Sequence, residues 1–136
     1  MKFHLKGEVK VYPTEDPEKV RTAVENLFSS VKISLEEEDN IQTLIFESKK
    51  MESLSKIKAI LRQDQIRDAV RKFLNEKIEG EKIGFYLNKQ VAYAGHVSLC
   101  EPFGESPLGP IKVEIECKDP KKLVDWLSPS SQQEYG

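Results

Sequence analysis

The stretch Phe3-His4-Leu5-Lys6-Gly7-Glu8-Val9-Lys10-Val11 decides how this chain begins to fold, because its apolar and polar side chains alternate. Alternation of this kind is typical of a β-strand with one buried face, and Gly7 within it predicts a β-bulge. Asp16 and Pro17 then follow as a helix N-cap and a proline in the first turn. The next apolar residues recur at helical spacing and predict a helix that packs on the strand. They are Val20, Ala23, Val24, Leu27 and Phe28.

A β-hairpin and two helices are predicted next. Residues 31–36 alternate between apolar and polar side chains, residues 41–46 are the predicted second arm, and Asp39-Asn40 predicts the turn that joins them. Residues 51–78 carry two apolar stripes at helical spacing. Asp64 lies between the stripes and is the predicted N-cap of the second helix; one kinked helix is the alternative.

Three further strands are predicted in the last part of the chain, at residues 83–87, 91–100 and 111–116. Asn88-Lys89-Gln90 is the predicted tight connection between the first two of them. One face of the strand 91–100 would carry small side chains and His96. Because both faces of that strand are then apolar or small, we expect a helix, a second subunit or a ligand to cover it.

The predicted order of elements is β-α-β-β-α-α-β-β-β-α, in which the last helix begins at Asp119-Pro120. Hairpins dominate this order and β-α-β units are few, which favours the α+β class. We expect a single domain over residues 1–127, built as a largely antiparallel sheet with helices packed on one face. Residues 128–136 are rich in serine, proline and glutamine and are expected to form a mobile tail.

The composition restricts the class of protein. Hydrophobic residues make up 38% and charged residues 32% of the chain, and the formal net charge is −2. No apolar run reaches the ~18 residues that a membrane-spanning helix needs, and the N-terminus lacks the apolar stretch of a secretion signal. The two cysteines are too few for a disulfide scaffold. We therefore expect a cytoplasmic protein with no membrane partner.

Charge is unevenly distributed along the chain. Residues 14–47 carry nine acidic and three basic side chains, whereas residues 49–72 carry eight basic and three acidic ones. A basic face attracts phosphate groups, and such binding depends on salt because each contact releases a counterion. The alternative is that both stretches are simply the solvated surface of a protein rich in lysine and glutamate.

Signatures of catalysis are missing from the sequence, which contains no glycine-rich phosphate loop, no nucleophile elbow and no paired-histidine zinc motif. The candidate metal ligands are scattered: His4, His96, Cys100 and Cys117. We expect the cysteines to be small buried hydrophobic residues and His96 to be a structural or interfacial histidine. The sequence therefore predicts no catalytic site, no metal and no cofactor.

Two clusters are candidates for contacts with a nucleic acid, and the first lies in the predicted helical segment 61–72. Arg67 and Arg71 are one helical turn apart and can grip consecutive phosphates, and Arg62 precedes them in the same segment. Ion pairs within the helix, for example from Asp68 to Arg71, are the alternative interpretation of these charges.

The second cluster surrounds the predicted turn within residues 85–93. Lys89 at the tip is a candidate for a phosphate contact. The neighbouring amides and tyrosines are candidates for contacts to sugar or base. They are Tyr86, Asn88, Gln90 and Tyr93. The alternative is structural, with the tyrosines packing against the core and Asn88 forming the turn.

These same blocks carry a resemblance to an uncharacterised family of small archaeal proteins, which is described as RNA-binding by prediction and linked to exosome function. The start of the chain, a strand followed by Pro13-Thr14-Glu15-Asp16-Pro17 and a helix, is also similar to that family, so the resemblance covers about residues 1–127. The blocks that carry it are Leu61-Arg62-Gln63-Asp64-Gln65-Ile66, Gly84-Phe85-Tyr86-Leu87-Asn88-Lys89-Gln90-Val91-Ala92-Tyr93-Ala94-Gly95-His96-Val97 and Pro107-Leu108-Gly109-Pro110-Ile111.

The resemblance implies a fold similar to the large-subunit ribosomal protein that binds 5S ribosomal RNA, and it implies homodimers. It implies no catalytic site. The chain also lacks the aromatic signature of an RNA-recognition-motif sheet and the GxxG loop of a KH domain.

Three functions stay open at this point. The favoured one is a non-catalytic RNA-binding or ribonucleoprotein-associated module, because of the basic segment 49–72, the predicted turn at Lys89 and the family resemblance. The second is an assembly factor that contacts other proteins through its acidic and basic faces. The third is a small-metabolite-binding protein, which depends only on His96 facing small residues.

Overall fold

Seven strands form one antiparallel sheet in the computed structural model, which describes residues 2–101 and 109–130. The strands are β1 (Phe3–Val11), β2 (Lys32–Glu38), β3 (Ile41–Ser48), β4 (Ile78–Glu79), β5 (Lys82–Leu87), β6 (Leu99–Cys100) and β7 (Ile111–Cys117). Their order in the sheet is β2-β3-β1-β7-β5-β4, and β6 pairs with the end of β5. The strand that opens the chain therefore lies near the centre of the sheet.

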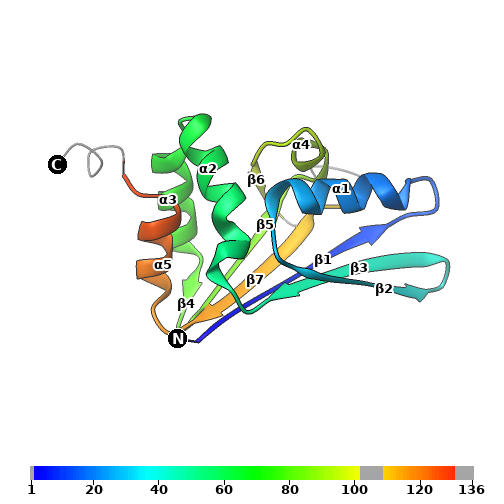
Figure 1. Ribbon diagram of the computed structural model, residues 1–136, viewed down its shortest axis with the longest axis horizontal. Coiled ribbons are helices and arrows are strands. Elements are labelled where there is room, and N and C mark those ends of the chain that lie inside the picture. The colour runs from blue at the N-terminus through cyan, green and yellow to red at the C-terminus, as the bar shows by residue number, and fades with distance from the viewer. Residues whose placement is uncertain (1, 102–108, 131–136) are drawn as a thin grey trace.

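The helices cover one face of this sheet and leave the other face open (Figure 1). They are α1 (Pro17–Leu27), the 3-10 helix η1 (Met51–Leu54), α2 (Ser55–Gln63), α3 (Arg67–Glu76), α4 (Lys89–Tyr93) and α5 (Pro120–Leu127). Figure 1 shows α3 and α5 side by side at one end of the layer and α1 at the other. The predicted α+β class, with an antiparallel sheet and helices on one face, is confirmed.

The central strand β1 shows why the layers form. Phe3, Leu5, Val9 and Val11 are buried under the helices, whereas the side chains between them face the open side. Gly7 forms no bulge, because its pairing with β3 and β7 is continuous. A Cβ atom at this position would overlap the ring of Phe46, so the glycine makes room for a core aromatic residue.

The predicted helix starts at Asp16 and Asp119 and the first hairpin turn are confirmed. Asp16 caps α1 by accepting a hydrogen bond from the backbone N–H of Glu18 at 3.0 Å, and Asp119 caps α5 in the same way. Asp39 and Asn40 join β2 to β3 with φ values of 52° and 67°. Two successive residues of positive φ form the kind of hairpin turn that matches the twist of the strands.

The predicted strand 91–100 is wrong, because the chain forms the short helix α4 there and only Leu99–Cys100 is a strand. Asn88 was predicted as a turn residue but acts as the N-cap of α4, accepting from the backbone N–H of Val91 at 3.0 Å. Ala92 is fully buried, and Asn26 of α1 donates to its carbonyl at 3.1 Å. Packing against α1 therefore selects a helix over the predicted hairpin.

The segment after α5 begins inside the fold. Ser128 is fully buried, and its hydroxyl donates to the carbonyl oxygen of Arg67 at 2.6 Å. This bond ties the end of α5 to the start of α3. The rest of the predicted tail, from residue 131, and most of the predicted loop, residues 102–108, lie outside the described residues.

Candidate functional site

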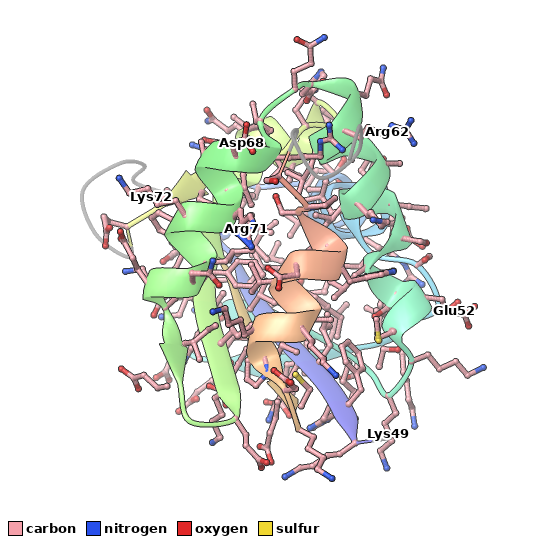
Figure 2. All side chains as sticks on the ribbon, turned by 90° about the vertical axis from the view of Figure 1, so that its left-hand side faces the viewer. Lys49, Glu52, Arg62, Asp68, Arg71 and Lys72 are labelled. Atoms are coloured by element: carbon pink, nitrogen blue, oxygen red, sulfur yellow. The ribbon has the colours of Figure 1, made fainter. Side chains whose placement is uncertain are left out.

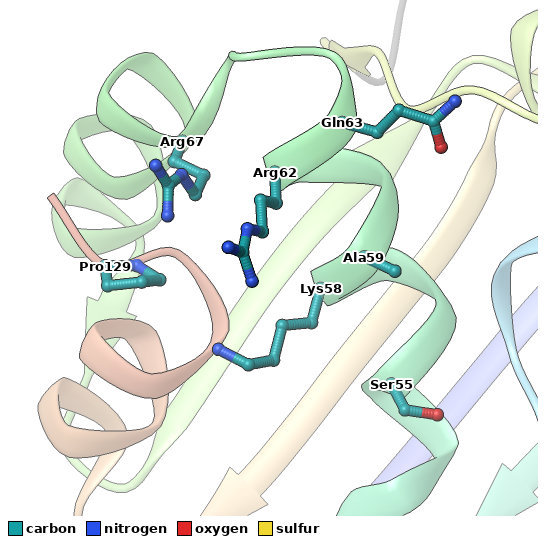
Figure 3. Close-up of a pocket in the computed structure, with 7 residues that line it drawn as sticks. All are labelled: Ser55, Lys58, Ala59, Arg62, Gln63, Arg67 and Pro129. Carbon is teal, nitrogen blue, oxygen red and sulfur yellow. The ribbon is translucent and has the colours of Figure 1, made fainter. Parts of the chain in front are cut away.

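A groove lies between α2, the start of α3 and the segment that follows α5 (Figure 3). Its volume is about 580 Å³. Three of its lining side chains are cationic, and they come from two helices. The lining residues are Ser55, Lys58, Ala59, Arg62, Gln63, Arg67 and Pro129.

Helix α2 positions two of the cations by its periodicity. Lys58 and Arg62 are one turn apart, so they lie on the same side of the helix, while Ile57 and Leu61 are buried in the core. The ammonium of Lys58 donates to the carbonyl oxygen of Trp126 at 2.5 Å and lies 5.1 Å from the centre of its ring. The position of Lys58 is therefore held by α5.

The turn between α2 and α3 brings Arg67 across the groove from Arg62 (Figure 3). Gln65 in this turn has a φ of 57°, and the backbone N–H of Ile66 donates to the carbonyl of Leu61 at 3.1 Å. Asp64 is the C-cap of α2 and does not cap α3 as predicted, since Ile66 occupies the position before Arg67.

The carboxylate of Asp64 instead contacts His96, whose Nδ1 lies 2.8 Å from Asp64 Oδ2. This contact joins the segment after α4 to the turn beside the groove. His96 is exposed, so the prediction that it faces a covered surface of small residues is wrong. The cause is the helix α4, which removes the strand on which that surface depended.

Arg71 does not join the groove. Its guanidinium donates to the carboxylate of Asp125 in α5 at 2.6 Å, and only 22% of the side chain is exposed. Figure 2 shows Arg71 between α3 and α5, whereas Lys72 points to the outer side of α3. Arg67 and Arg71 are thus one turn apart but line two different hollows of the surface.

The basic segment as a whole is dispersed over this side of the molecule. In Figure 2, Lys49 and Arg62 lie at opposite ends of the face formed by α2, α3 and α5. Of the basic residues in segment 49–72, only Lys58, Arg62 and Arg67 therefore line the groove.

Lys89 is buried on another part of the molecule, with 6% of its side chain exposed. Its ammonium lies 3.0 Å from a carboxylate oxygen of Glu15 and donates to the carbonyl oxygen of Lys10 at 2.9 Å. Burial lowers the pKa of Lys89, and the hydrogen bond and charge of Glu15 oppose this shift. This placement removes Lys89 from the candidate phosphate-binding residues.

The four residues predicted to contact sugar or base do not line the groove. Tyr86 lies on the open face of the sheet in β5, and the side chain of Asn88 is used to cap α4. Gln90 and Tyr93 are exposed on α4, where 46% of Tyr93 is accessible. The structure therefore separates these side chains from Arg62 and Arg67.

Lys58 is the groove residue that sequence reasoning missed. The signal was present, because Lys58 and Arg62 have the same i, i+4 spacing that drew attention to Arg67 and Arg71. The contact between Lys58 and Trp126, 68 residues later in the chain, could not be seen from spacing.

The structure adds two observations on other classes of site. Within residues 2–101 and 109–130, no group of three histidine, cysteine or acidic side chains is arranged to hold a metal ion. None of the helices in this part of the chain is both long enough and apolar enough to cross a membrane.

Comparison with known proteins assigns the family. A family model described as "RNA binding" matches residues 4–117, which is most of the chain. The chain belongs to this family. Relatives named UPF0201 protein are 48% identical in Sulfolobus acidocaldarius and 45% identical in Sulfurisphaera tokodaii, each over 91% of this chain and 86% of the relative.

A solved structure supports the same family and fold. The crystal structure of the UPF0201 protein from Methanococcus jannaschii matches with a TM-score of 0.83 and 32% identity, over 94% of each chain. The expected membership of an archaeal family is thereby confirmed. The link to the exosome and the likeness to the ribosomal protein stay predictions.

Proposed function

We propose that this protein is a non-catalytic RNA-binding module and that the groove between α2 and α3 contacts the phosphate backbone. The observation that carries the proposal is the convergence of Lys58, Arg62 and Arg67 on one hollow of about 580 Å³. The family model described as "RNA binding" supports the same class of ligand. Arginine suits this role because its planar guanidinium can donate two parallel hydrogen bonds to one phosphate.

The lining of the groove favours phosphate contacts over recognition of bases. None of its seven lining residues is aromatic, so it offers no ring on which a base can stack. Among the lining residues of the groove, Ser55 carries the hydroxyl group. This hydroxyl already donates a hydrogen bond to the carbonyl oxygen of Glu52 at 2.8 Å. No carboxylate or imidazole lines the groove beside Ser55, which is why we propose binding without catalysis.

The test is binding of the full chain to a fluorescent RNA hairpin and to a single-stranded RNA, measured by anisotropy at low and at physiological salt. We expect affinity to fall as salt rises. Arg62→Ala/Arg67→Ala should weaken binding by about tenfold or more, because two charge-assisted contacts are lost.

The matched control is Lys19→Ala/Arg21→Ala, which removes the same charge from α1. Both control positions are exposed. Equal losses in the two double variants would show only a response to net charge and would contradict a site in the groove. Binding that is insensitive to salt would contradict the proposal as a whole.

We further propose that the protein acts as a homodimer in the cytoplasm. The family resemblance supports this, and the edge strand β2 offers an unpaired backbone with Leu35 52% exposed. Sedimentation velocity over a range of protein concentrations tests the proposal. We expect a species of twice the chain mass, and the chain mass at every concentration would contradict it.

A further inference from the structure

A second pocket of about 540 Å³ lies at the end of the sheet where β1 begins and β7 ends. Its walls are α5 on one side and η1 on the other. Most of its lining is apolar or aromatic, and lysines surround its mouth. The lining residues are Lys2, Phe3, Met51, Cys117, Lys118, Asp119, Lys122, Leu123 and Trp126. None of these residues lines the cationic groove.

Helix α5 builds one wall by its periodicity. Asp119, Lys122, Leu123 and Trp126 lie at positions i, i+3, i+4 and i+7, so they share one face of the helix and its cap. Leu123 is 5% exposed and forms part of the deep wall. Trp126 is half-buried, with Lys58 on its ring from the side of the groove.

The floor of the pocket is apolar and uncharged. Phe3 of β1 and Cys117 of β7 are paired across the two strands, and they are 8% and 7% exposed. Burial raises the pKa of the Cys117 thiol, so this sulfur stays neutral at physiological pH. Met51 of η1 adds a flexible thioether to the opposite wall.

The mouth of the pocket carries two lysines, Lys118 and Lys122, that form no ion pair with the described residues. Lys118 and Lys122 are both exposed, and no carboxylate of the described residues lies within ion-pair distance of either. Lys2 differs, because Glu81 and Glu116 hold its ammonium at 3.2 and 2.8 Å. The carboxylate of Asp119 accepts the backbone N–H of Lys122 as the helix cap.

We propose that this pocket binds an amphipathic carboxylate, with its apolar chain against Phe3, Leu123 and Trp126 and its carboxylate at Lys118 and Lys122. The two lysines at the mouth favour an acid over a neutral or cationic ligand, and the uncharged deep lining fits the apolar chain of that acid. The volume is within the ~300–1,000 Å³ that small-ligand pockets occupy, and a mostly apolar lining with a few polar groups is their usual composition. This site shares no lining residue with the groove of the proposed RNA contact, and the two meet where Lys58 contacts Trp126.

Trp126 makes the proposal testable, because it is the only tryptophan in the chain. We would titrate the full chain, without RNA, with sodium decanoate below its micelle concentration and follow tryptophan emission. Decyltrimethylammonium, which has the same chain length and the opposite charge, is the matched ligand. The expected result is a saturable change in emission with decanoate and at least about tenfold weaker binding of the cation.

A double charge-reversal variant tests whether decanoate binds at the two lysines of the pocket mouth. Lys118→Glu/Lys122→Glu should weaken decanoate binding by about tenfold or more, since two favourable charges become repulsive. Lys6→Glu/Lys10→Glu makes the same change of net charge on the open face of the sheet and should leave binding unchanged. Thermal melting of both variants verifies that they fold.

Three results would overturn the proposal. The first is emission that does not saturate with decanoate, and the second is equal affinity for the anionic and the cationic chain. The third is a decanoate affinity that falls as protein concentration rises, because a second copy of the chain would then occupy the pocket. Loss of RNA binding in the groove variants has no bearing on these outcomes.

Discussion

Lys58 beside the groove and Lys89 at the start of α4 are similar side chains in opposite surroundings. Lys58 is partly exposed and its ammonium rests on the carbonyl and ring of Trp126, next to two arginines. Lys89 is 6% exposed and its ammonium faces the carboxylate of Glu15. The difference lies in the partner. The buried carboxylate of Glu15 holds Lys89 inside the fold, where it has a structural role, whereas Lys58 stays at a surface that a phosphate can reach.

The largest effect is expected from Lys89→Met. This change leaves the carboxylate of Glu15, whose side chain is 10% exposed, without its charge partner. Removing one member of a buried pair costs about 3–5 kcal/mol, so urea unfolding should show a loss of that size. RNA affinity should stay within about twofold, because α4 does not line the groove.

The control for this prediction is Glu15→Gln/Lys89→Met, which removes both charges. It should recover part of the lost stability, because no buried charge is left unpaired. A Lys89→Met variant as stable as the wild type would contradict the buried pair, and one that lost RNA affinity while staying folded would restore Lys89 to the binding surface.

A smaller effect is expected from Asn88→Ala. Because Asn88 caps α4, its loss should lower the free energy of unfolding by about 1 kcal/mol. Asp16→Ala at the start of α1 is the matched loss of a cap and should cost a similar amount. Unchanged stability in Asn88→Ala alone, measured by urea unfolding, would mean that the α4 cap contributes nothing.

The pH dependence of stability gives a third comparison. Burial lowers the pKa of Lys89 in the folded chain below its ordinary value of 10.5, which the unfolded chain keeps. At a pH between the folded and the unfolded pKa, the unfolded chain therefore binds more protons than the folded chain. The free energy of unfolding should therefore rise with pH in that alkaline window. The measurement is the difference between wild type and Glu15→Gln/Lys89→Met across it; a difference that falls as pH rises would contradict the lowered pKa.

The smallest change in stability is expected from Lys58→Ala. A partly exposed contact between a cation and a ring contributes about 0.5–1 kcal/mol, so unfolding should shift by no more than that. Emission of Trp126 should change, because the ammonium leaves its ring. RNA affinity should fall several-fold, and an unchanged affinity would remove Lys58 from the proposed site.

Local patterns were enough to predict most of the framework. The alternation in β1, the caps at Asp16 and Asp119 and the turn at Asp39-Asn40 each have a cause within a few residues of chain. The same local rules failed where a tertiary contact decides. Helix α4 has five residues, too few for a clear apolar period, and it depends on packing against α1.

The candidate site was predictable only in part. Arg62 and Arg67 were named from the sequence and do meet at the groove. Arg71 was named with them, but its partner Asp125 lies 54 residues away in the chain. Lys89 and Glu15 are 74 residues apart, so their pairing leaves no signal in the spacing of charges. Charge composition therefore predicted which side chains were available and not which of them stay at the surface.

The most direct test of the central claim is the salt dependence of RNA hairpin binding by the wild type and by Lys58→Ala/Arg62→Ala/Arg67→Ala. Each phosphate contact contributes about 0.9 to the slope of log affinity against log salt. If the three groove cations contact phosphates, the triple variant should lose about 3 from the magnitude of that slope while its urea unfolding changes little. An identical slope in the two proteins would contradict the account.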